Sequence, residues 1–291
     1  MKKIKVVDLV VGVILLFFVI YALQPILNLL ALSLTHPDSV QELSGLDIFP
    51  KKISLLNYQF ILSNPSILKG IFNSVLYTAI GVFLSVSFTV ITAFALTREQ
   101  LIGRRIFIVI TIFVMVFEPG IVPEYFVMKD FNLLGSMWSI ILYKMVNVYY
   151  LVIMMRFFED IPKSIEEAAL LDGANPIQML SKVFAPMSKP SIATITLFYS
   201  VYRWNEYFRS GIYLSSKPSK WPLQVVLRQF VVLEDTQAIV GGFDQMSQVY
   251  GSMNFEALQA AAIIVGILPI LIIYPIILRY FTKGTFEGSS K

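Results

Sequence analysis

The sequence predicts an all-α membrane protein, and three observations support this fold class. Apolar residues make up 56% of the 291 residues and charged residues 14%, whereas soluble domains have roughly 45–50% and about 25%. Apolar runs of about 20 residues, the length that a helix needs to cross the hydrocarbon layer, recur along the chain. Because irregular backbone cannot face lipid, each of these runs is expected to be helical.

Six runs qualify as transmembrane helices, and together they predict a single transmembrane domain over residues 1–291. Their approximate limits are 9–34, 70–97, 106–128, 135–155, 190–214 and 257–278. The first, second and sixth contain no Asp, Glu, Lys or Arg. The other three carry charges in or near the apolar run, and Pro119 and Pro123 are expected to kink the third.

The distribution of Lys and Arg predicts how the chain is oriented in the membrane. With the N-terminus inside, the cytoplasmic segments carry these residues more densely than the outer loops do, as the positive-inside rule requires. Both termini and the loop 160–189 are therefore expected in the cytoplasm. The net charge of +4 is spread over the loops, so it gives no reason to expect a nucleic-acid partner. The chain has no cysteine, which excludes disulfides and thiolate metal sites.

The loop 160–189, called the acidic hairpin below, begins with a predicted short helix. Pro162 suits the start of that helix. Glu166 and Glu167 follow near its beginning, where the helix macrodipole favours acidic groups. Gly173 permits the left-handed turn that commonly ends a helix.

A second amphipathic helix is expected after Asn175 and Pro176. Its apolar face consists of residues at helical spacing: Ile177, Leu180, Val183 and Phe184. Pro186 and Pro190 are expected to end this helix before the next span. The two helices would fold against each other and present alanines and carboxylates outward. Spacing alone leaves two interpretations open: a surface that a partner binds, and an amphipathic segment that lies under the membrane.

The acidic hairpin resembles the EAA loop of the permease subunits of binding-protein-dependent ABC importers. Glu167-Ala168-Ala169, Gly173 and Ala185-Pro186 match the family pattern in order and spacing, with Ala185 where Leu is usual. Asp172-Gly173-Ala174 is similar to the carbohydrate-uptake branch, which includes the maltose-type inner-membrane subunits. Further segments resemble the same family: Leu55-Leu56-Asn57-Tyr58, Gly103-Arg104-Arg105, Trp204-Asn205 and Pro222-Leu223-Gln224. The ending, Tyr280-Phe281-Thr282-Lys283-Gly284 with Gly288-Ser289-Ser290-Lys291, is similar to the lipoprotein-permease-like subgroup.

This resemblance implies six transmembrane helices with a cytoplasmic EAA coupling-helix loop that fits a groove of an ATPase subunit. The residues that would take this coupling role are Glu166, Glu167, Ala168, Ala169, Asp172, Gly173 and Ala174. The implied partners are a homologous permease subunit in a heterodimer, two ABC ATPase subunits, an extracellular solute-binding protein, an oligosaccharide substrate and the lipid of a bacterial cell membrane. The chain itself would bind no cofactor, because ATP and Mg would belong to the ATPase subunits.

The chain lacks the sequence patterns of an energy-supplying or catalytic subunit. It contains no G-x-x-x-x-G-K-[ST] phosphate loop, no H-E-x-x-H and no G-x-S-x-G. We therefore expect a non-catalytic membrane subunit whose energy comes from another polypeptide.

Charged residues inside the predicted spans mark a candidate translocation pathway, because charge at membrane depth must face protein or water. Glu118 and Lys144 could pair across consecutive spans, and Arg203 and Glu206 could pair on one helix face. With their polar and aromatic neighbours, the candidate pathway residues are Glu118, Lys144, Asn147, Tyr199, Arg203, Trp204, Asn205 and Glu206. Such a mixture suits a sugar, which offers apolar CH faces to aromatic rings and hydroxyls to polar groups. Alternatively, these residues only hold helices together or face the sister permease.

Together these features predict the permease subunit of an ATP-driven ABC importer that translocates oligosaccharides or complex glycans. The family usually carries less charge at the positions of Lys144, Arg203 and Glu206, which indicates a charged or unusually large glycan, or a packing scheme specific to this subunit. Two alternatives stay open: an ion-coupled secondary transporter, in which Glu118 and Lys144 could serve proton coupling, and an ABC permease for a non-sugar solute.

Overall fold

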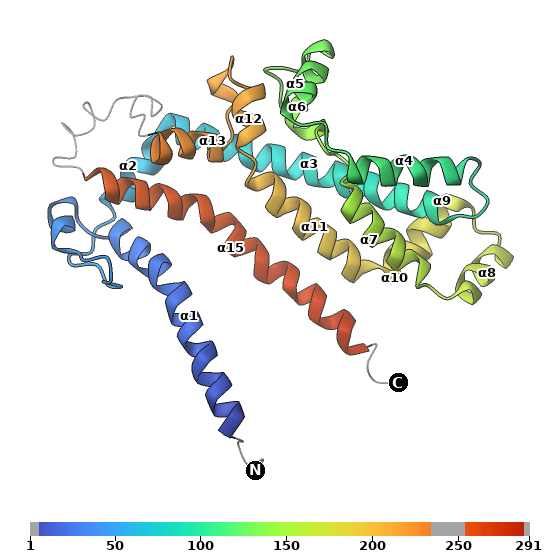
Figure 1. Ribbon diagram of the computed structural model, residues 1–291, viewed down its shortest axis with the longest axis horizontal. Helices are drawn as coiled ribbons and strands as arrows, with labels where there is room; N and C mark the ends of the chain where they lie inside the picture. Colours follow the sequence, from blue (N-terminus) through green and yellow to red (C-terminus); the bar gives the residue numbers. More distant parts are fainter. Residues whose placement is uncertain (1–5, 234–253, 288–291) are drawn as a thin grey trace. The chain divides into compact units, whose positions relative to one another are not determined.

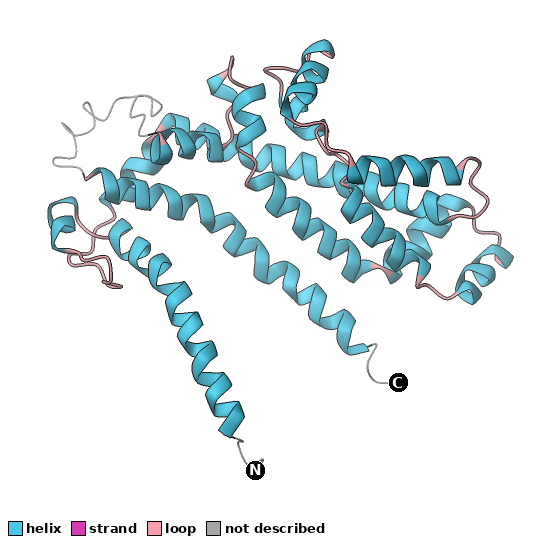
Figure 2. Cartoon of the chain, viewed as in Figure 1, coloured by secondary structure: helices cyan, strands magenta, loops and turns pink. Residues whose placement is uncertain are grey.

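The computed structural model describes residues 6–233 and 254–287 as helices joined by loops (Figure 1). Within these residues the pairing of extended backbone is limited to an isolated bridge between Thr35 and Ile53, and Figure 2 shows the helical character throughout. The chain divides into two compact units, Met1–Lys69 with Val226–Leu268 and Gly70–Val225 with Pro269–Lys291. Residues 1–5 at the N-terminus and the C-terminal residues Gly288–Lys291 lie outside the described residues.

The first unit is organised around the end of α1 (Val6–Ser33), followed by a 3-10 helix (Pro37–Glu42) and α2 (Leu56–Ser63). The buried side-chain amide of Asn57 donates to the carbonyls of Ser33 and Thr35, each at 3.0 Å. The Tyr58 hydroxyl lies 2.7 Å from Ser33 Oγ. The Asn-Tyr pair therefore binds α2 to carbonyls and a hydroxyl at the end of α1, where a helix leaves backbone acceptors unsatisfied. A long helix, α15 (Phe255–Glu287), begins in this unit.

The second unit holds most of the remaining helices, and the candidate site lies within it. They are α3 (Pro65–Thr97), α4 (Arg104–Val116), α5 (Ile121–Asp130), α6 (Met137–Leu142), α7 (Val148–Glu159), α8 (Lys163–Leu171), α9 (Pro176–Gln178), α10 (Ala185–Met187), α11 (Lys189–Trp204), α12 (Phe208–Tyr213) and α13 (Leu223–Leu227).

Three helices among the described residues are long and apolar enough to cross a membrane: Val7–Ser33, Pro65–Thr97 and Phe255–Pro275. They correspond to the three predicted spans that contain no charge. The other three predicted spans are each divided into two shorter helices, so the expectation of a continuous helix is wrong for all three. The divisions fall between α4 and α5, between α6 and α7, and between α11 and α12.

The break between α4 and α5 has a local cause in the residues Phe117–Gly120. Pro119 has no N–H to continue the helix, and Gly120 adopts φ +82°, which glycine tolerates best. Pro119 therefore breaks this span, as its sequence position suggested. Pro123 does not kink it, because it lies in the first turn of α5, where the missing N–H would have no intrahelical partner.

The other two breaks are stabilised by side chains that bind free N–H groups of the following helix. Between α6 and α7, Lys144 takes φ +42°, and Asn147 Oδ1 accepts from the Tyr149 N–H at 2.9 Å. Between α11 and α12, Glu206 Oε1 accepts from the Arg209 N–H at 2.7 Å. Both are caps at a helix start, so polar side chains fix the points where these helices begin.

Among its described residues, the second unit contains two separate hydrophobic cores on either side of these breaks. One joins the later part of α3 to α7, the acidic hairpin and α11, and includes Phe94, Phe158 and Phe184. The other joins the earlier part of α3 to α5, α6 and α12, and includes Tyr77 and Tyr213. Figure 1 shows α5, α6 and α12 grouped together, away from α8 and α10. The breaks therefore lie where the two packed regions meet.

Candidate functional site

The acidic hairpin turns by a Schellman motif at the end of α8. The Gly173 N–H donates to the Leu170 carbonyl and the Ala174 N–H to the Ala169 carbonyl, both at 3.0 Å. This pair of bonds requires a left-handed residue after the helix, and Gly173 supplies it with φ +77°. The prediction that Gly173 forms the turn is confirmed.

The second helix of the hairpin begins as expected and continues further than expected. Asn175 and Gln178 form a capping box, with Pro176 in the first turn. Pro186 does not end this helix, because the backbone stays helical to Met187. A π-helical turn over Met179–Phe184 directly precedes Pro186. Its wider hydrogen-bonding pattern displaces the carbonyls against which a proline ring would otherwise press.

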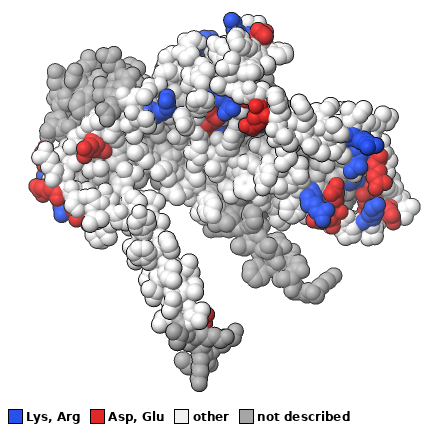
Figure 3. Space-filling model, viewed as in Figure 1, with Lys and Arg blue, Asp and Glu red and all other residues white. Residues whose placement is uncertain are grey.

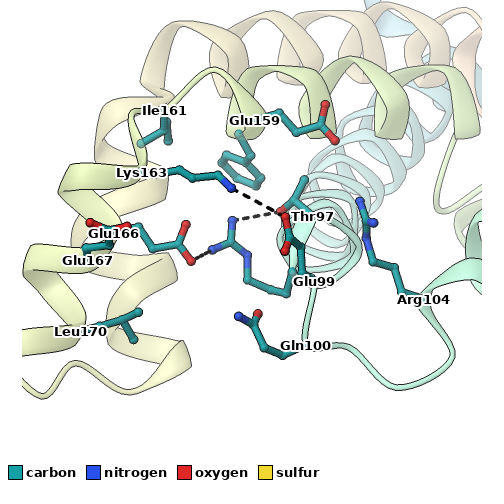
Figure 4. A pocket seen from close by; sticks show the side chains of 12 residues that line it. Thr97, Glu99, Gln100, Arg104, Glu159, Ile161, Lys163, Glu166, Glu167 and Leu170 are labelled. Atoms are coloured by element: carbon teal, nitrogen blue, oxygen red, sulfur yellow. Dashed lines mark hydrogen bonds and ion pairs between the residues drawn. The ribbon is translucent and has the colours of Figure 1, made fainter.

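An ion pair joins the hairpin to the end of α3. The Arg98 guanidinium binds the Glu166 carboxylate, and it lies 4.8 Å from the centre of the Phe94 ring and 4.5 Å from that of Phe184. Lys163 Nζ adds a weaker contact to Glu99 at 3.7 Å. The four charged side chains of these two contacts line a pocket of about 430 Å³ between α3, α7 and α8 (Figure 4). Glu166 is therefore used inside the chain and does not belong to the free surface of α8.

The two faces of the hairpin differ in what they expose. Ala169 and Ala174 pack against the core beneath, so the expectation that all alanines point outward is wrong for these two. Glu167, Ala168, Asp172 and Gly173 are exposed. Large apolar side chains accompany them: Leu171 is 89% exposed and Ile177 is 79% exposed. Ile177 thus leaves the apolar face that its spacing predicted, and the outer surface combines carboxylates with uncovered apolar groups.

Arg203 holds the two packed regions of the second unit together. Its guanidinium donates to Ser85 Oγ on α3 at 2.7 Å and to the Ile140 and Ile141 carbonyls in the last turn of α6, at 3.1 and 3.0 Å. The side chain is buried. The predicted pair with Glu206 is wrong: among the described residues Arg203 makes no ion pair, because the orphan carbonyls at the end of α6 attract it instead.

Tyr199 makes a second link across the same junction. Its hydroxyl lies 2.7 Å from Thr89 Oγ1 on α3 and accepts from the Asn147 N–H at 2.8 Å. Tyr199 is fully buried and Trp204 is 4% exposed, whereas Asn205, at the end of α11, is exposed. Several candidate pathway residues are thus internal packing and hydrogen-bonding groups in this chain.

Glu118 and Lys144 form the ion pair that their positions on consecutive spans predicted. Lys144 Nζ binds Glu118 Oε1, although their side chains are 34% and 68% exposed. Both residues lie in the helix breaks, in the residues 117–120 and 143–147. Figure 3 shows charged side chains near α12 as well as at the end of the unit that carries α8. The breaks therefore concentrate charge in the middle of otherwise apolar segments.

Glu124 and Arg209 belong to this charge cluster, and the sequence analysis did not single them out. Arg209 Nε binds Glu124 Oε2 at 2.8 Å, with a second contact from Nη2 to Oε1 at 3.3 Å. The Arg209 guanidinium lies 4.2 Å from the centre of the Tyr143 ring, whose hydroxyl donates to Glu124. Glu124 lies inside a predicted span, and that unexplained charge was the signal that could have identified it.

Such an arrangement of apolar helices, helix breaks at charged residues and an exposed acidic hairpin defines a membrane transport subunit. No family model matches the chain, but full-length relatives do. The chain is 35% identical over 290 residues to the polygalacturonan/rhamnogalacturonan transport system permease protein YtcP of Bacillus subtilis, covering 99% of both chains. It is 36% identical over 244 residues to protein LplC of the same species, covering 84% of this chain and 81% of LplC.

A solved structure is similar to this chain in fold as well as in sequence. A chain of a bacterial ABC transporter that imports the acidic polysaccharide alginate superposes with a TM-score of 0.87 and 33% identity, covering 97% of this chain and 98% of that one. The chain therefore belongs to the family of carbohydrate ABC transport system permeases, and it is a membrane protein.

Proposed function

We propose that this chain is the permease subunit of an ATP-driven importer for acidic oligosaccharides in a bacterial cell membrane. Two similar proteins support the acidic substrate class: one is named for polygalacturonan and rhamnogalacturonan, and the other belongs to an alginate importer. Alginate is an acidic polysaccharide, and galacturonans carry the carboxyl group of galacturonic acid. Charged residues at membrane depth must face water or protein, because the hydrocarbon of lipid does not solvate charge. The charged residues in the helix breaks therefore fit a hydrated pathway for such a substrate.

The three divided spans cross the membrane as pairs of short helices in this proposal. Non-helical backbone at membrane depth is tolerated where it is buried in protein or lines water, and transporters build substrate sites from discontinuous helices. Both termini and the acidic hairpin lie in the cytoplasm, in agreement with the positions of Lys and Arg.

The exposed face of the acidic hairpin binds an ATPase subunit. Glu167 and Asp172 offer carboxylates to basic groups of that partner, Ala168 permits close approach, and Leu171 supplies apolar area. The ion pair between Arg98 and Glu166 transmits the movement of the hairpin to α3, and the partly buried Ala169 and Ala174 transmit it to the core. The complete importer adds a sister permease, two ATPase subunits that bind ATP and Mg, and an extracellular binding protein. This chain performs no covalent chemistry.

The proposal rests on the hairpin: one of its faces is bound to α3, and the opposite face, which carries acidic and apolar side chains, is uncovered. The test is ATP hydrolysis by the reconstituted importer in response to its loaded binding protein. Glu167→Arg should reduce this stimulation about tenfold or more, while Glu159→Arg, a charge reversal at the end of α7, should not. Equal stimulation in the two variants would contradict the docking role.

A secondary transporter is distinguished by its energy source. Uptake through the proposed importer stops when ATP is depleted and continues when an uncoupler collapses the ion gradient. The reverse pattern would favour ion coupling through Glu118 and Lys144.

A further inference from the structure

The ion pair between Lys144 and Glu118 stands apart from the other charges near the helix breaks because it is exposed. Their side chains are 34% and 68% exposed, whereas Arg209 and Glu124 are 22% and 13% exposed. An exposed ion pair at membrane depth cannot face lipid without a large desolvation cost. The surface that carries Lys144 and Glu118 therefore faces water or another protein subunit.

The neighbouring charged groups already use their hydrogen-bonding capacity inside the chain. Both oxygens of Glu124 are bound by Arg209, and one also accepts from Tyr143. Both terminal nitrogens of Arg203 donate to protein acceptors. In contrast, Lys144 has three N–H donors, and within the described part of the chain its ion-pair partner is Glu118. Lys144 is thus the accessible cation of this cluster.

The backbone holds Lys144 in position. Its φ of +42° is uncommon for a residue other than glycine, asparagine or aspartate. Residues held in such conformations cluster at ligand-binding sites, where the surrounding structure fixes them. Here the preceding Tyr143 is 8% exposed and packs in the core formed by α5, α6 and α12. The next fixed point is Asn147, which caps α7. The strained residue therefore projects its ammonium group from a rigid support.

We propose that Lys144 receives a carboxylate of the acidic oligosaccharide during translocation, and that Glu118 is the resting counter-ion that the substrate carboxylate displaces. The exchange replaces one carboxylate by another at the same ammonium group, and water solvates the released Glu118 carboxylate, whose side chain is 68% exposed. No covalent bond forms or breaks. Competition from Glu118 limits the affinity of the site. This limit suits a pathway, in which binding must be weak enough to allow release.

The inference rests on the proposed function, so its test includes a measurement of that function. The intact importer is reconstituted with its sister permease, ATPase subunits and binding protein, and ATP-dependent uptake is measured. The probes are trigalacturonate and trimannuronate, together with their full methyl esters, which keep the sugar skeleton and remove the charge. Failure to import any saccharide at the expense of ATP would overturn the proposed function. Import of the esters in preference to the acids would overturn the charge-based inference and the acidic substrate class, and it would leave the proposal of an ATP-driven oligosaccharide importer standing.

The role of the pair is then tested by equilibrium binding of the imported uronate trisaccharide to the purified importer without its binding protein. Lys144→Gln should weaken binding about tenfold or more, and Glu118→Gln should strengthen it about tenfold, since each change corresponds to one charged contact. The double variant should bind as weakly as Lys144→Gln. The methyl ester should respond to neither substitution.

A purely structural ion pair gives the opposite pattern. Each single substitution would then leave one charge unpaired and impair the importer, while the double variant, which has no unpaired charge, would recover. Recovery in the double variant, or weaker binding by Glu118→Gln, would overturn the inference. Absence of measurable binding even in Glu118→Gln would also count against it, because that variant removes the competing carboxylate.

Discussion

Substitution of Gly173 tests how the acidic hairpin is held in shape. A Cβ atom added at this position meets no atom within 4 Å, and the backbone φ is +77°. Gly173→Ala should therefore cost only the strain of a left-handed alanine, about 1–2 kcal/mol, with no steric clash. The open form of the turn should become roughly 5- to 30-fold more populated. Both Schellman hydrogen bonds, from the N–H groups of residues 173 and 174, would open with it.

Hydrogen exchange of the purified complex measures this opening directly. The amide protons of residues 173 and 174 should exchange faster in Gly173→Ala by the same factor, and stimulation of the ATPase should fall in parallel. Gly173→Asn is the matched control, because asparagine enters the left-handed region more readily and should change exchange less. Equal exchange in the alanine variant and the wild type would show that the turn does not depend on the left-handed conformation of residue 173.

Three further predictions concern contacts elsewhere in the chain. Arg98→Ala should lower the thermal stability of the purified complex more than Glu166→Ala, because the guanidinium also stacks on two phenylalanine rings. The double variant should reveal a coupling free energy of about 0.5–1 kcal/mol between the two residues. A coupling near zero would contradict the ion pair. Arg203→Met should destabilise the complex by about 3 kcal/mol, since it leaves buried acceptors unpaired. Gly81→Ala should cost about 1–3 kcal/mol, because its Cβ would lie 2.7 Å from Arg203 Cδ. Wild-type unfolding temperatures in Arg203→Met and Gly81→Ala would contradict this role of the Arg203 contacts. A backbone N–H and a nearby lysine hold the pKa of Asp47 below its ordinary value, so the carboxylate should stabilise its loop above the ordinary aspartate pKa and lose that effect as the pH falls through the lowered pKa. Amide exchange in the loop should show this pH dependence in the wild type and lose it in Asp47→Asn. A pH dependence that persists in Asp47→Asn would contradict the explanation.

Sequence reasoning succeeded where the cause of a structure lies within a few residues. Gly173 ends α8 because only a left-handed residue completes the turn, and Asn175 starts the next helix because its side chain binds an N–H three residues on. Pro119 breaks its span for the equally local reason that it cannot donate a hydrogen bond. The pair of Glu118 and Lys144 was also predictable, since opposite charges on adjacent spans have few other partners at that depth.

The reasoning failed where a nearby partner competes with a distant one. Glu206 lies three residues from Arg203 and was the obvious choice. The guanidinium instead binds Ser85 and the Ile140 carbonyl, which are 118 and 63 residues away. Likewise, the side chain of Arg209 binds Glu124, which is 85 residues away in another predicted span. No local pattern distinguishes these outcomes, because they depend on which helix ends meet.

An apolar helical membrane protein with an acidic hairpin between its fourth and fifth apolar segments could be predicted from the residues alone. Composition and the local conformational limits of glycine, proline and asparagine suffice for that. Which charged side chains bind other helices inside the chain, and which are open to a ligand, follows from the packing of the helices. Burial and hydrogen-bond partners depend on the packing of distant helices. For this reason Arg203 is buried and bound to α3 and α6, while Lys144 is accessible.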